Sequence, residues 1–99
     1  IGEEAHYILR SNYDHDAKRY TTPYVVCGKS GEAGYKDLAG SNARLNCPGQ
    51  GTFVYNKKYE EDNKKDHYDF YFADRKNHCI RKLTPEGMVT TFPEEEVKI

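Results

Sequence analysis

The chain has 99 residues, of which 36% are hydrophobic, 13% aromatic and 31% charged. This length allows one domain with a small core, and with nine Tyr and four Phe much of that core must consist of rings whose hydroxyl needs a partner or water. Fifteen basic and sixteen acidic residues leave a net charge of −1, which argues against nucleic acid or an anionic membrane as a partner. No apolar run reaches the roughly 20 residues of a membrane span, so we expect a soluble protein.

The chain is mixed and largely polar up to residue 22. It begins with Ile1 instead of Met, which suggests that a leader was cleaved or that a longer chain was trimmed. We interpret residues 1–22 as an N-terminal arm, because much of this region is polar and aperiodic. The apolar run Tyr24-Val-Val-Cys27 follows Pro23 and ends at a glycine turn, which predicts a buried strand at the start of a domain spanning residues 23–93.

The middle of the chain is less regular. Residues 32–44 contain two glycines, and either a short helix or an irregular edge strand is compatible with them. Residues 52–59 predict the next strand, with Phe53 and Tyr55 on one face. The polar residues 60–66 predict an exposed loop, because a packed core cannot use them.

Residues 68–92 carry the clearest pattern and predict a β-meander. Strands are expected at 68–72, 79–83 and 88–92, separated by a polar turn at 74–77 and a Pro-Gly turn at 84–87. Beyond them, residues 94–99 are interpreted as a tail, because Pro93 cannot donate a ladder hydrogen bond and the next three residues are like-charged.

The cysteines and histidines give few signs of chemistry. Cys27, Cys47 and Cys79 contain no C-x-x-C pair, so one disulfide with one free thiol, or three reduced thiols, are the open alternatives. The histidines have no spacing that places two on one helix turn or strand face, and we expect no metal and no cofactor. A nucleophilic cysteine is also disfavoured, because His78 and Cys79 point to opposite faces of a strand.

Three segments resemble the MAX effectors, which are small secreted virulence proteins of the rice blast fungus and its relatives. They are the strand–turn–Cys segment 70–79, the Pro-Gly turn and strand 84–89, and the strand 23–27 that ends in a cysteine. The resemblance implies an all-β fold, a six-stranded antiparallel β-sandwich of two small sheets with an N-terminal extension. It also implies a disulfide between Cys27 and Cys79.

The same resemblance implies a function. Such a protein would be secreted, reach the cytoplasm of a plant host cell, and bind a host protein such as a heavy-metal-associated domain. It would act as a monomer without enzymatic activity, and a plant immune receptor would recognise it. Binding would use an exposed strand edge or the N-terminal arm.

Two other classes remain as alternatives. The segment Asp66-His67-Tyr68 is similar to the histidine strand of microbial ribonucleases, active or degenerate. In such a site His67 would be the acid, Glu60 or Glu61 the base, and Arg75 or Arg81 the phosphate ligand. About 25 residues follow His67, however, whereas the histidine strand of those enzymes closes the chain. The other alternative is a secreted inhibitor or toxin module.

Tyrosines define the expected binding surface. Tyrosine buries much area at low entropic cost, and the tyrosines of the predicted strands are too many to fit inside one small core. The candidate surface residues are Tyr55, Tyr59, Tyr68 and Tyr71, with Arg75 in the adjacent turn.

Overall fold

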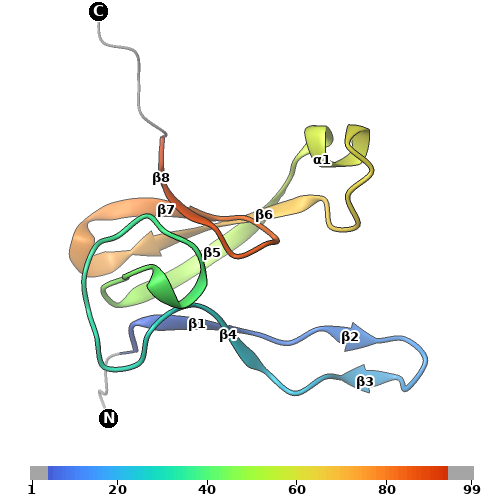
Figure 1. Ribbon diagram of the computed structural model, residues 1–99, viewed down its shortest axis with the longest axis horizontal. Coiled ribbons are helices and arrows are strands. Elements are labelled where there is room, and N and C mark those ends of the chain that lie inside the picture. Colours follow the sequence, from blue (N-terminus) through green and yellow to red (C-terminus); the bar gives the residue numbers. More distant parts are fainter. Residues whose placement is uncertain (1–4, 94–99) are drawn as a thin grey trace, which may run out of the picture.

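A computed structural model describes residues 5–93 (Figure 1). Its strands form sheets of two, two and four members, so the prediction of an all-β protein is confirmed. This arrangement does not match the predicted six-stranded sandwich. The first four residues of the predicted arm and the predicted tail at 94–99 lie outside the described residues.

A long antiparallel hairpin forms the N-terminal part of the structure. Strand β1 pairs with β4, and further out β2 pairs with β3, so that the hairpin tip extends away from the rest of the molecule (Figure 1). The bounds are Tyr7–Arg10 for β1, Tyr13–Asp14 for β2, Arg19–Tyr20 for β3 and Tyr24–Gly28 for β4. Strand pairing therefore crosses the predicted boundary at residue 22, because Ile8 is the partner of Cys27.

The C-terminal half forms a four-stranded antiparallel sheet in sequence order. Its strands are β5 (Pro48–Tyr55), β6 (Tyr68–Asp74), β7 (Cys79–Leu83) and β8 (Val89–Phe92). The last three are the predicted meander. The polar turn between β6 and β7 contains a 3₁₀ turn at Arg75–Asn77 followed by a left-handed His78.

The strand expected at residues 52–59 ends early. Strand β5 stops at Tyr55, and α1 (Lys57–Glu61) begins in its place. The cause is Asn56, whose side chain accepts a hydrogen bond of 3.0 Å from the backbone N–H of Lys58 and so caps the helix. The predicted exposed loop thus begins with the last turn of a short helix.

The core lies on one face of the four-stranded sheet, which we call the inner face. It packs against β4 and against the irregular segment 29–47 that joins the hairpin to the sheet (Figure 1). This segment contains a one-turn 3₁₀ helix at Gly40–Asn42 and isolated antiparallel bridges that join Lys36 to Arg44 and Ala39 to Met88 at the edge of the sheet. Of the two alternatives for residues 32–44, the irregular edge strand is therefore the nearer one, and a longer helix does not form. The buried cluster consists of Cys27, Ala43, Leu45, Phe72, Leu83 and Val89.

A buried arginine fastens the irregular segment to the inner face. Arg81 is fully buried, and its guanidinium donates to Asp74 at 2.5 Å and to Asp37 at 2.8 Å. It also donates to the backbone carbonyls of Lys36 and Arg44, at 3.0 and 3.1 Å. Its cation lies 4.7 Å from the centre of the Tyr35 ring. Arg81 is therefore a structural residue and not a ligand for phosphate.

Candidate functional site: an apolar groove

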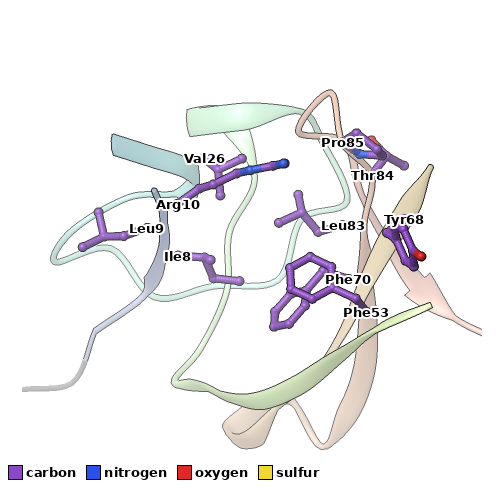
Figure 2. Close-up of a pocket in the computed structure, with 10 residues that line it drawn as sticks. All are labelled: Ile8, Leu9, Arg10, Val26, Phe53, Tyr68, Phe70, Leu83, Thr84 and Pro85. Carbon is purple, nitrogen blue, oxygen red and sulfur yellow. The ribbon is translucent and has the colours of Figure 1, made fainter. Parts of the chain in front are cut away.

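An apolar groove opens between the hairpin and the inner face of the sheet. It has a volume of about 260 Å³ and receives side chains from β1, β4, β5, β6, β7 and the turn that follows β7 (Figure 2). Its lining residues are Ile8, Leu9, Arg10, Val26, Phe53, Tyr68, Phe70, Leu83, Thr84 and Pro85.

Aromatic rings form the sheet side of the groove. Phe53 and Phe70 are partners in the β5–β6 register, and their ring centres lie 5.0 Å apart. The Phe70 ring also stacks on Phe72, at 5.8 Å, which connects the groove to the buried core. Phe53 nevertheless remains 64% exposed, so the groove offers a large apolar surface to a partner.

A glycine makes room for these rings. A Cβ atom added at Gly51 would lie 2.2 Å from the carbonyl oxygen of Tyr71 and 2.8 Å from the tip of the Phe70 ring. Such distances are far below van der Waals contact. The close approach of β5 to β6 at this point, and with it the position of Phe70, therefore requires glycine.

One ion pair lies at the rim. Arg10 donates to Asp66 at 2.8 Å, which connects the hairpin to the loop before β6. The two side chains are 30% and 49% exposed, so solvent screens the pair and its contribution to stability is about 0–1 kcal/mol. The Arg10 side chain contributes its aliphatic part and a cation to a groove whose other polar groups are the hydroxyls of Tyr68 and Thr84.

The predicted surface tyrosines do not form one surface. Tyr68 lines the groove, and Tyr55 packs edge-on against it at 5.6 Å. Tyr71 lies on the opposite face of the sheet, against Phe92. Tyr59 is held by α1, where its hydroxyl donates to the buried carboxylate of Asp69 at 2.7 Å. Burial is the largest cause, and this hydrogen bond the next, of a pKa of Tyr59 that is raised above its usual range.

Arg75 lies at the other end of the sheet. Its Nε donates to the carbonyl oxygen of Cys47 at 3.0 Å, and its side chain packs over Gly49.

The sequence interpretation missed Phe53, Phe70 and the hairpin residues of the groove as members of one site. The available signal was the alternation of rings on β5 and β6, which places them on one face, but nothing in the sequence showed that β1 would lie opposite.

The expected disulfide is absent from the structure, where Cys27 and Cys79 are both free thiols. Cys27 is fully buried in the core, and burial raises the pKa of its thiol to about 12. Cys79 is opposite Asp74 at the end of the β6–β7 pair and is not part of the core cluster. Burial raises the pKa of this thiol too, so neither cysteine has the lowered pKa of a nucleophile.

The residues considered for a ribonuclease do not converge. Arg81 is inside the core, and Glu60 accepts a hydrogen bond from the Tyr55 hydroxyl. The Nε2 atom of His67 forms a hydrogen bond of 2.7 Å with the carbonyl oxygen of Lys64. Within residues 5–93 no group of three His, Cys, Asp or Glu side chains is placed to hold a metal ion. No helix in this part of the chain is long and apolar enough to cross a membrane.

Comparison with known proteins relates the chain to bacteria. No family model and no curated protein matches it. Among solved structures, an auxiliary nutrient binding protein of Bacteroides thetaiotaomicron is 55% identical over 93% of this chain, with a TM-score of 0.83. An auxiliary nutrient binding protein of Bacteroides ovatus is 46% identical over 87%, with a TM-score of 0.80. This chain is similar to a segment of bacterial nutrient-binding proteins.

A further similar structure, also from B. thetaiotaomicron, has the provisional name phosphatase. It is 48% identical over 89% of this chain, with a TM-score of 0.80. The chain covers 21% of the auxiliary nutrient binding protein of B. thetaiotaomicron and 20% of that of B. ovatus. It covers 18% of the protein with the phosphatase name. It therefore spans about a fifth of the length of each relative.

These similarities overturn the fungal assignment. The MAX resemblance was based on short strands, turns and a cysteine pair, which many antiparallel proteins share, whereas the bacterial identity extends over nearly the whole chain. The predicted roles as an effector, as an avirulence protein and as a ligand of a plant host protein are therefore wrong. So is the expected location in a host cell cytoplasm, and the ribonuclease alternative has no support among the relatives.

Proposed function

We propose that the chain is a non-catalytic binding module of a longer bacterial nutrient-binding protein, and that the apolar groove is its binding site. The observation that carries the proposal is the identity of 46–55% to segments of two auxiliary nutrient binding proteins. Of the three relatives described above, one has the phosphatase name and two are nutrient binding proteins. The separate positions of His67, Glu60 and Arg81 also favour binding over catalysis.

The shape and chemistry of the groove indicate the class of ligand. Ligand pockets usually have volumes of roughly 300–1,000 Å³, and this groove, at about 260 Å³, lies just below that range. It fits a compact group such as a single aromatic ring or a branched aliphatic chain. Phe53, Phe70 and Tyr68 offer ring contacts, and Arg10 at the rim would orient a polar or anionic end of the ligand.

Titration with indole, followed by NMR, tests the groove. We expect saturable shifts of the Phe53, Phe70 and Leu83 resonances at millimolar indole. Phe53→Ser should remove them, because it deletes the most exposed wall of the groove. Phe92→Ser is the matched control, since Phe92 is also an exposed ring but lies on the opposite face of the sheet. Equal loss of binding in both variants, or unsaturable shifts, would refute the groove as a site.

The absence of catalysis is tested separately. We expect the chain to hydrolyse p-nitrophenyl phosphate no faster than buffer at pH 5, 7 and 9, with and without added Mg²⁺ or Zn²⁺. Saturable hydrolysis that copurifies with the chain and disappears on His67→Ala would contradict the proposal.

A further inference from the structure

The opposite face of the four-stranded sheet, which we call the outer face, carries its own apolar patch. Every strand of the sheet contributes one side chain to it, and together these line a shallow depression: Val54 from β5, Tyr71 from β6, Ile80 from β7 and Phe92 from β8. The Tyr71 and Phe92 rings pack edge to face at 5.1 Å. Val54, Ile80 and Phe92 remain 44%, 41% and 46% exposed.

The register shows that this patch is continuous. Ile80 is directly opposite Phe92 in the β7–β8 pair, and Tyr71 follows one diagonal step away on β6. Val54 on β5 is opposite Asp69 and so lies one further diagonal step from Tyr71. Cross-strand and diagonal neighbours on one face lie about 4.5–8 Å apart, so the four side chains form an oblique apolar row across the whole sheet. An antiparallel sheet that faces water usually presents polar residues on that face.

The inner face of the same sheet is already covered over its central and C-terminal strands, whereas the groove leaves Phe53 exposed at its other edge. Phe72, Leu83 and Val89 are buried there against β4 and the segment 29–47. The outer face also carries polar side chains beside the row, namely Thr52, Lys82 and Thr90. The apolar row nevertheless gives the sheet apolar side chains on both faces, which is the pattern of an internal layer in a stack, in which a second sheet lies about 10 Å away.

From this arrangement we propose that the outer face is an intramolecular interface, on which another β-sheet of a longer polypeptide packs. The occupant is a sheet face of branched aliphatic and aromatic side chains from the same chain. Two observations favour this partner. About four-fifths of each relative lies outside the matching segment. Strand β8 ends at Phe92 within the patch, so in a longer protein the chain would leave the sheet at this interface.

A chimera tests this inference in a full-length protein. This chain would replace the matching segment of the 55% identical B. thetaiotaomicron protein, and the chimera would be compared with its Ile80→Lys variant. We expect Ile80→Lys to increase the rate of cleavage by a protease within this segment at least tenfold, because a buried lysine would separate the two sheets. Tyr20→Lys, at the exposed hairpin tip, is the matched control and should change the rate less than twofold.

Two further measurements make the result decisive. In the isolated chain Ile80→Lys should lower the urea midpoint only slightly, because Ile80 is 41% exposed there and loses only its cross-strand contacts; unfolding would overturn the inference. An isolated chain that dimerises at micromolar concentration through this patch would identify a second copy as the occupant and would also overturn it. If the chimera does not fold, the test is the burial of the four equivalent side chains in the solved structure of the relative. Burial beneath another β-sheet supports the inference, and exposure to solvent refutes it.

Discussion

The buried arginine provides the most quantitative test of how this fold is held together. Arg81 bonds two carboxylates, of Asp74 and Asp37, and the two carbonyl oxygens of Lys36 and Arg44. The substitution Arg81→Met keeps an unbranched chain of similar length but removes all of these bonds. The Asp74 carboxylate would then be left buried without its cation, although Asn77 still donates to it at 2.7 Å.

The expected cost follows from this uncompensated charge. Removing one partner of a buried pair typically costs about 3–5 kcal/mol. A domain of this size is stable by roughly 5–15 kcal/mol in total, so the variant should lose a large part of its free energy of unfolding. Far-UV circular dichroism against urea would measure the change as a lower midpoint with a similar slope.

Arg10→Met is the matched control. The Arg10–Asp66 and Arg81–Asp37 pairs have the same N–O distance of 2.8 Å, but the Arg10 pair is solvent-exposed on both sides. Its removal should cost about 0–1 kcal/mol. A cost for Arg81→Met no larger than that of Arg10→Met would refute the argument that burial, and not distance, determines the importance of the two pairs.

Three further predictions concern single residues. Gly51→Ala should destabilise the protein by more than about 1 kcal/mol in the same urea assay, because the added Cβ meets backbone at 2.2 Å; a neutral result would mean that β5 can move away from β6. Tyr59→Phe should cost about 1–3 kcal/mol by removing a donor to the buried Asp69, whereas Tyr20→Phe at the exposed hairpin tip should be neutral within about 0.5 kcal/mol. Folding holds the Cys27 thiol protonated, with its pKa raised from 9.0 to about 12, so the unfolded chain loses this proton first and stability should fall as pH rises from 9 to 12. Cys27→Ala should flatten that decline in urea titrations at pH 8 and 10.5, and an unchanged slope would contradict the assignment.

Local patterns in the sequence were enough to predict the meander. Residues 68–72 place Tyr68, Phe70 and Phe72 on one face, and the rest of the segment 68–92 combines β-favouring runs with turn residues at the right spacing, so strand pairing between neighbours follows from short-range preferences. The early end of β5 was also readable in principle, because Asn56 is a good helix cap. The burial of Arg81 was not, since its partners are 7, 37, 44 and 45 residues away along the chain.

The sequence by itself determined the class of secondary structure, the order of the C-terminal strands and the excess of tyrosine over the needs of a small core. Only the tertiary structure decided which faces these residues occupy. The groove exists because β1 folds back over Phe53 and Phe70, and the separation of Tyr68 from Tyr71 follows from the alternation of β6 between two sheet faces. Such contacts join positions that are distant in the chain. The hydrophobic effect that drives them is non-directional, so the pattern of residues along the sequence does not show which of them will meet.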